Sequence, residues 1–135
     1  MKRTIFNPKT VGRPIAPYSH AIIVEARRLM FIAGQVAVDK KSRVVGVGDF
    51  RRQFAQVFAN LEGILKAAGA GFRHVVQFTT FMVDSRDMPA FFEARNKLFK
   101  RIYPKGDYPP NTLLVIDRLA REDFLLEVEA IAALD

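Results

Sequence analysis

The stretch DFRRQFAQVFANLEGILKAAGAG, residues 49–71, is the clearest helical sequence in the chain. Asp49 is a suitable N-cap because its carboxylate can accept the free backbone N–H groups of the first turn. Gly69 is a suitable C-cap. The apolar side chains recur at three- and four-residue intervals, which places them on one helix face that has to be buried against another layer. That face consists of Phe50, Phe54, Val57, Phe58, Leu61, Ile64 and Leu65.

The segments on either side of this helix predict that the other layer is a sheet. Residues 74–84 are rich in β-branched and aromatic side chains, which favour a strand. Residues 87–102 predict a second helix, with Pro89 acceptable only in its first turn. Its inner face is expected to contain Met88, Phe91, Phe92, Arg95, Leu98, Phe99 and Ile102.

The two ends of the chain supply the remaining strands. Gly34 lies inside one of them, which indicates a bulge or the close approach of a ligand or another backbone. The order β-β-α-β-α-β-β predicts one α+β domain over residues 1–135, with one sheet covered by two helices. The strands are expected as a hairpin of 21–25 and 29–38, and as a final antiparallel pair of 111–119 and 124–133.

The composition excludes several classes of protein. The chain has no Cys and only two His, His20 and His74, so disulfides, thiolate chemistry and a zinc site are not expected. No stretch approaches the roughly 20 apolar residues of a membrane span. No signal peptide is visible at residues 1–10. A cytoplasmic protein is therefore expected.

The net charge of +7 suits acidic ligands, but the basic residues are scattered along the chain. They form either an ordinary solvated surface or an anion-attracting face. The Phe residues lie at core spacing and not among exposed basic residues, so the chain lacks the sequence pattern of a nucleic-acid stacking platform. Nucleic acid is accordingly the partner that these residues favour least.

Residues 113–116, Leu-Leu-Val-Ile, are apolar at every position, so both faces of this strand should be covered. Two helices on one side of a sheet cover only one of these faces. A partner subunit is the simplest cover for the other, and the sequence therefore predicts a homo-oligomer.

The alternation in FLLEVEAIAAL, residues 124–134, places two carboxylates on one face of the last strand. Glu127 and Glu129 are expected to lie roughly 6–7 Å apart, the rise of two strand residues. Such a pair could perform acid–base chemistry, with pKa values raised by burial. Alternatively, the two carboxylates could form ion pairs with Arg or Lys across the strand or across a subunit boundary.

Five segments taken together resemble the Rid family, the YjgF-like reactive-intermediate deaminases. The resemblance runs from about residue 7 to residue 133, in order and at family spacing. The segments are APYSHAIIV (16–24), MFIAGQVAVD (30–39), NLEGILKAAGAG (60–71), VVQFTTFMVD (75–84) and LLEVEAIA (125–132).

This resemblance implies a chorismate-mutase-like fold with one mixed sheet backed by two helices. It also implies a homotrimer whose sheets face inward around a central barrel, with a small-molecule site in each of three clefts between subunits. Members with known activity hydrolyse enamines and imines to a keto acid and ammonia without a metal or organic cofactor. Some members are described as translation inhibitors that bind or cleave RNA.

Matching the family motifs residue by residue assigns roles to individual positions. Glu127 falls on the acidic residue that holds a water and is the candidate catalytic residue. Tyr18 falls on the tyrosine near the cleft, and Gly34 on the glycine whose backbone approaches the ligand carboxylate. Thr112 falls on the small polar residue at the start of the strand that begins near residue 111.

Three positions depart from the pattern of active imine deaminases. Asn111 stands where an arginine grips the substrate carboxylate, Phe92 stands where a helix asparagine often lies, and Ala33 replaces a serine. A guanidinium forms a two-pronged ion pair that an amide cannot form. We therefore expect an altered ligand, another cation in place of the missing arginine, or an inactive cleft. Arg13 is a candidate for that cation by sequence.

Three functions remain open at this stage. The first is an enamine or imine deaminase with an altered substrate. The second is a non-catalytic trimer that binds a small ligand as a sensor or regulator. The third, and the one that the residues favour least, is RNA binding or cleavage.

Overall fold

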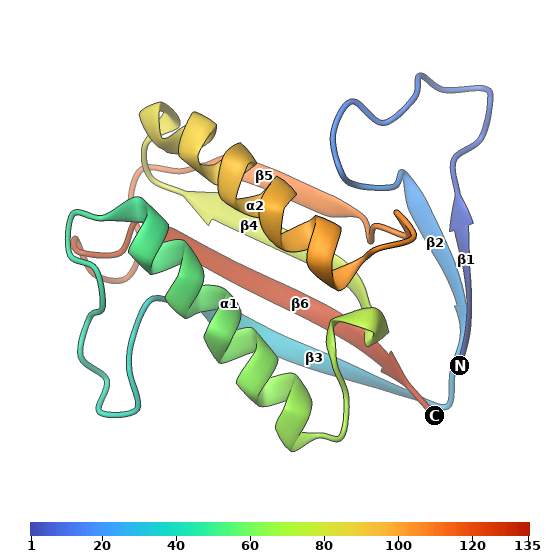
Figure 1. Cartoon of the computed structure of the whole chain (residues 1–135), viewed down its shortest axis with the longest axis horizontal. Coiled ribbons are helices and arrows are strands. Elements are labelled where there is room, and N and C mark those ends of the chain that lie inside the picture. The colour runs from blue at the N-terminus through green and yellow to red at the C-terminus, as the bar shows by residue number, and fades with distance from the viewer.

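The computed structural model describes all 135 residues as two helices packed on one face of a mixed four-stranded sheet, with a separate two-stranded sheet at one end (Figure 1). The α+β class and the two helices on one mixed sheet are confirmed. The elements are β1 (Lys2–Phe6), β2 (Ala21–Glu25), β3 (Arg28–Gln35), α1 (Phe50–Ala67), β4 (Val75–Met82), α2 (Met88–Ile102), β5 (Asn111–Val115) and β6 (Leu126–Leu134), with short 3₁₀ turns at Phe72–His74 and Ser85–Asp87.

The strand pairing differs from the two pairs expected from the sequence. β2 pairs with β1, a strand that the sequence analysis missed, and not with β3. The chain turns sharply after Glu25, and the Arg27 N–H then donates to the Leu134 carbonyl, which directs β3 along β6. Strand propensity is a local property and does not specify the partner strand, which explains the wrong hairpin.

The expected antiparallel pair of residues 111–119 and 124–133 is also wrong. β5 runs parallel to β4, and β6 lies antiparallel between β3 and β4, so the strand order is β3-β6-β4-β5. The segment from β4 through α2 to β5 is a βαβ crossover, the usual connection between adjacent parallel strands. β5 is consequently an edge strand, and Pro109 and Pro110 precede it.

The helix ends follow the sequence closely. The Asp49 carboxylate accepts a hydrogen bond from the Arg52 N–H at 3.1 Å, as expected for an N-cap. At the other end of α1, Ala68 is the C-cap and Gly69 takes the left-handed conformation after it, with φ +69°. The N–H groups of Gly69 and Ala70 return to carbonyls of the last turn, an arrangement typical of the Schellman motif.

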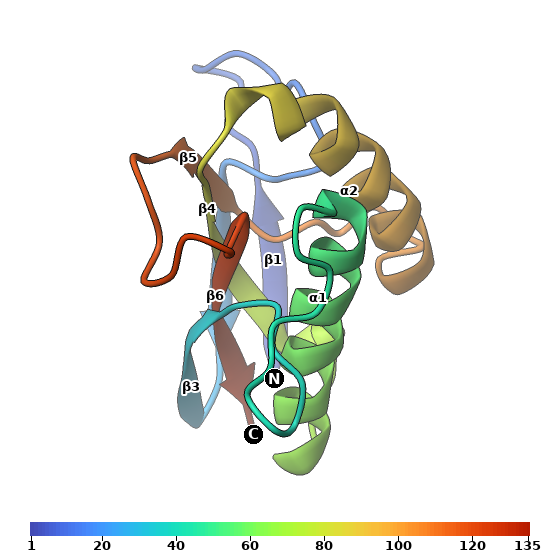
Figure 2. The same ribbon diagram turned by 90° about the vertical axis from the view of Figure 1, so that its left-hand side faces the viewer.

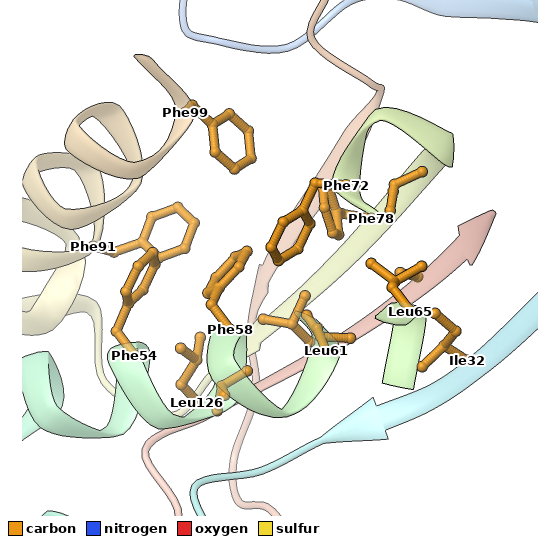
Figure 3. Packing of buried hydrophobic residues seen from close by; sticks show 14 of the residues in the cluster. Ile32, Phe54, Phe58, Leu61, Leu65, Phe72, Phe78, Phe91, Phe99 and Leu126 are labelled. Carbon is orange, nitrogen blue, oxygen red and sulfur yellow. The ribbon is translucent and has the colours of Figure 1, made fainter. Parts of the chain in front are cut away.

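Aromatic rings fill the space between the helices and the sheet (Figure 3). Phe78 of β4 is 1% exposed and lies against Phe58 of α1 and Phe99 of α2, with ring centroids 6.0 and 5.9 Å apart. Buried Gln53 joins α1 to the loop before β6. Its side chain donates to the Gly46 and Asp123 carbonyls and accepts from the Leu125 N–H. The helices and β6 are thus fixed to one another by packing and by buried hydrogen bonds.

Only one face of the sheet is covered within the chain. Figure 2 shows both helices on the same side, with no helix on the opposite side, where the loop between β5 and β6 projects. We call this opposite side the outer face. Leu29 and Phe31 of β3 are 55% and 73% exposed, and Leu114 of β5 is 40% exposed. Their pairing places them on the outer face, so the run at 113–116 is covered on one face only. No helix is both long and apolar enough to cross a bilayer.

The position of Phe78 between the two helices yields a stability prediction. Phe78→Ala should lower the free energy of unfolding by about 3–5 kcal/mol, because the change leaves a cavity among rings that cannot fully collapse. Val47→Ala is the control. Because Val47 is 65% exposed in a loop, this change should alter the free energy of unfolding by no more than about 0.5 kcal/mol. Denaturant unfolding at one protein concentration measures both. A loss below about 1 kcal/mol for Phe78→Ala would contradict the central role of this ring.

Candidate functional site

Glu127 and Gly34 meet on the outer face of the sheet. The alternation along β6 buries Leu126 and Val128 under the helices and turns Glu127 the other way, as the sequence predicts. Gly34 lies at an irregularity of β3, where the pairing with β6 shifts between Ile32 and Gln35. A Cβ atom on residue 34 would lie 1.9 Å from Glu127 Oε1. The carboxyl group therefore occupies the space that any other residue at position 34 would fill. We call these two residues the carboxyl half-site.

The environment of Glu127 favours its protonated form. Partial burial is the larger cause that raises the pKa of Glu127 above the usual 4.5, and the nearby charge of Glu129 is the smaller one. None of the ion pairs in the chain involves Glu127 or Glu129, so neither forms an ion pair across the strand within one subunit. A carboxyl with a raised pKa and no cationic partner is suited to donating and accepting a proton.

Asn111 and Thr112 point to opposite faces of the sheet. Asn111 pairs with Phe78 on the helix side, where its Oδ1 accepts a hydrogen bond from the buried Thr80 hydroxyl at 2.9 Å. Its amide nitrogen has no hydrogen-bond partner within the chain. Thr112 pairs with Thr79 and is exposed on the outer face. While Oδ1 accepts from Thr80, the amide N–H groups of Asn111 are free to donate to a ligand.

Phe92 lies beside an arginine that the sequence analysis placed on the inner face of α2 but did not recognise as a site residue. Phe92 is 38% exposed, and its ring centroid is 5.2 Å from the Arg95 guanidinium carbon. Arg95 itself is 4% exposed. The missed signal was a cation in the middle of an apolar stripe, four residues after Phe91. We call Asn111, Phe92 and Arg95 the edge half-site.

Tyr18 lies in the long loop between β1 and β2. The next residue, Ser19, is buried and donates a hydrogen bond to the Tyr108 carbonyl at 2.6 Å, which ties this loop to the segment leading into Asn111. The Tyr18 ring is half-buried and lies edge-on to His20, with centroids 6.1 Å apart. Arg13 is exposed in the same loop and forms no ion pair within the chain.

The two half-sites do not form one cleft within a single chain, because they lie on opposite faces of the sheet. A groove of 670 Å³ lies elsewhere, between α1 and α2, and none of the residues expected at the site lines it. No group of three or more His, Cys, Asp or Glu side chains gathers where it could hold a metal ion. The chain thus presents two separate sets of functional groups.

Comparison with known proteins adds an independent line of observation. Residues 10–134 match the model of the family described as Endoribonuclease L-PSP. A RutC family protein of Pyrococcus horikoshii is 35% identical over 132 residues, which cover 98% of each chain. The human 2-iminobutanoate/2-iminopropanoate deaminase is 32% identical over 132 residues, 98% of this chain and 90% of that protein. The crystal structure of YyfB from Yersinia pestis, a conserved Rid family protein of unknown function, superposes with a TM-score of 0.86 at 35% identity, covering 99% of this chain and 100% of that one.

The close approach of Gly34 to Glu127 can be tested by a double-mutant cycle. Gly34→Ala should lower the free energy of unfolding by about 1–3 kcal/mol, because the new methyl group displaces the carboxyl. In the Glu127→Asp background the shorter side chain should reduce this loss, giving a coupling of at least about 0.5 kcal/mol.

The matched control for this cycle is Gly63→Ala. Gly63 is exposed in α1 with nothing within 4 Å of an added Cβ, so alanine should stabilise the chain by about 0.5–1 kcal/mol. If Gly34→Ala cost the same in both backgrounds, the carboxyl of Glu127 would not lie over Gly34.

Proposed function

Since this chain belongs to the Endoribonuclease L-PSP family, which includes the RutC and Rid proteins, we propose that it hydrolyses a small imine or enamine at clefts shared between copies of the chain. The observation that carries the proposal is the carboxyl half-site. Glu127 is a partly buried carboxyl of raised pKa, held over a glycine and free of any cationic partner. The human relative named as a 2-iminobutanoate/2-iminopropanoate deaminase supports the reaction class.

The proposed reaction needs one group that both gives and takes a proton. Protonated Glu127 gives its proton to the imine nitrogen while a water oxygen bonds to the imine carbon, and the carboxylate takes the proton that the water loses. The same carboxyl then moves the hydroxyl proton to the nitrogen as the C–N bond breaks. The products are a carbonyl compound and ammonia. Its raised pKa makes Glu127 more readily protonated near neutral pH than an ordinary glutamate.

A homotrimer would complete the cleft. The carboxyl half-site and the edge half-site lie on opposite faces of one sheet, so they can share a ligand only if they come from different subunits. The exposed Leu29, Phe31 and Leu114 give the outer face an apolar surface suited to burial against another copy. In this arrangement Glu127 of one subunit faces Asn111 of the next. Gly34 lines the cleft from the first subunit, with Tyr18 and Thr112 at its margins.

Specific observations keep two other functions in view. Asn111 replaces the arginine of active imine deaminases, which favours a trimer that binds a small ligand without turnover. The family description names an endoribonuclease, and the net charge of +7 is compatible with RNA. Against RNA cleavage, His20 lies in an exposed loop while the His74 ring accepts a backbone hydrogen bond from Gly71 on a separate segment, so the two do not form one acid–base pair.

The deaminase proposal predicts that the purified protein accelerates ammonia release from freshly generated 2-iminopropanoate. Glu127→Gln should reduce kcat by about 10²–10⁴-fold with little change in KM, because the amide cannot transfer the proton. Glu122→Gln, which alters an exposed carboxylate paired with Arg118 in the loop before β6, should leave both constants unchanged. No acceleration by the unaltered protein would exclude this substrate, and an unchanged kcat in Glu127→Gln would exclude Glu127 as the catalytic residue.

The trimer proposal predicts a mass of three times 15.3 kDa in solution. Phe31→Glu should shift the mass toward that of one chain, because it places a charge on the apolar outer face. Val47→Glu, at an exposed loop residue away from this face, should leave the mass unchanged. Analytical ultracentrifugation distinguishes these masses, and an unaltered protein that sediments as a single chain would contradict the shared cleft.

A further inference from the structure

Arg95 is a buried cation without a counterion. The residue is 4% exposed, and no carboxylate forms an ion pair with it. Its Nε is buried without any hydrogen-bond partner, and its one side-chain hydrogen bond joins Nη2 to the neighbouring Asn96 Oδ1 at 3.3 Å. Burying a charge that is neither paired nor fully hydrogen-bonded is costly. A guanidinium in this state is prepared to receive an anion.

The guanidinium also lies on the side of α2 that faces away from α1. Ala94, Leu98 and two basic residues of α2 line the groove toward α1, but Arg95 does not. Arg95 contacts Phe91, and it contacts Phe92 and Asn96 on the side of α2 opposite to this groove. Because α2 covers β4 and β5, that opposite side lies above the free edge of β5 (Figure 1).

The helix register brings Arg95 over the strand residues next to Asn111. Phe99 packs on Phe78, with ring centroids 5.9 Å apart. Arg95 lies one helical turn before Phe99, a step of about 5.4 Å, and α2 runs antiparallel to β4. The same step along a strand is roughly two residues, which leads from Phe78 to Thr80. Thr80 is the residue whose hydroxyl holds the Asn111 side chain.

These placements gather unpaired hydrogen-bond donors at the edge half-site. The Asn111 oxygen accepts from the Thr80 hydroxyl, and its amide N–H groups are free. Arg95 contributes unpaired guanidinium N–H groups, and Phe92 provides an apolar wall 5.2 Å away. Burial lowers the pKa of Arg95, but an arginine in a protein remains charged. A planar anion with two oxygens, such as a carboxylate, matches this set.

We propose that Arg95 binds the carboxylate of a small 2-imino or 2-keto acid, with the Asn111 amide as second donor, so that the cation of the cleft comes from α2 and not from the start of β5. The inference rests on the proposed function, because it names the substrate class of the same cleft. It assigns the charge to Arg95 and not to the exposed Arg13. Asn111 is then a partner of the guanidinium and not a substitute for it.

The test uses binding of a stable product-like acid, 2-oxobutanoate, and of its uncharged counterpart 2-butanone, both measured by NMR titration of the full-length protein. Arg95→Met keeps the length and apolar contacts of the side chain and removes the charge. It should weaken binding of 2-oxobutanoate by about 10–100-fold, as expected for a charge-assisted hydrogen bond, and leave binding of 2-butanone unchanged. Arg101→Met, on the groove side of the same helix, is the matched control and should bind 2-oxobutanoate like the unaltered protein.

A second variant tests the relocation of the charge directly. Adding Asn111→Arg to Arg95→Met should restore 2-oxobutanoate binding to within about threefold, a rescue that a purely structural role of Arg95 would not produce. If Arg95→Met does not fold, the Arg95 Nε–H signal of the unaltered protein provides the readout. It should shift with 2-oxobutanoate and not with 2-butanone.

Each outcome bears on one of the two proposals. Equal 2-oxobutanoate binding by Arg95→Met and the unaltered protein, an unmoved Nε–H signal, or no binding by the unaltered protein would overturn the assignment of Arg95. Arg95-dependent binding without ammonia release from any 2-imino acid would support the assignment and overturn the deaminase proposal.

Discussion

The fold depends on the register of β6, which is hydrogen-bonded on both sides, to β3 and to β4. Its side chains alternate, so Leu126, Val128 and Ala130 lie under the helices while Glu127 and Glu129 point the other way. A shift of one residue would bury two carboxylates in an aromatic core and expose the apolar set, which makes any other register costly. The same alternation that secures the core therefore fixes the candidate catalytic carboxyl on the uncovered face.

The two half-sites illustrate how one sheet can contribute twice to an assembly. The outer face carries the Glu127 carboxyl over a glycine, and the helix side carries the Asn111 amide on β5 and the Arg95 guanidinium beside the Phe92 ring on α2. Neither set is complete alone. An oligomer that places the outer face of one chain beside the β5 edge of another would combine acid–base chemistry with recognition of charge. Catalytic competence would then be a property of the assembly and not of the folded chain.

The sequence predicts the features that local chemistry decides. Apolar periodicity predicts both helices, Asp49 and Gly69 mark the ends of α1, alternation predicts the orientation of Glu127, and Gly34 indicates the irregularity that β3 shows beside β6. It does not predict strand partners, because β2 and β5 have similar propensities whichever strand they pair with. Arg95 escaped notice as a site residue because only the three-dimensional contacts reveal that it is buried and unpaired. Its place on an apolar stripe suggested packing alone.

The short length of β5 has a consequence for solubility. An edge strand presents unpaired N–H and C=O groups that can recruit a foreign strand and begin fibril growth. Here the strand spans only Asn111–Val115, and Pro109 and Pro110 precede it with no N–H groups to donate. At the other end the Ile116 N–H is already bonded to the Met82 carbonyl. The two prolines that precede β5 thus also protect this edge strand from pairing with strands of other molecules in cross-β aggregates.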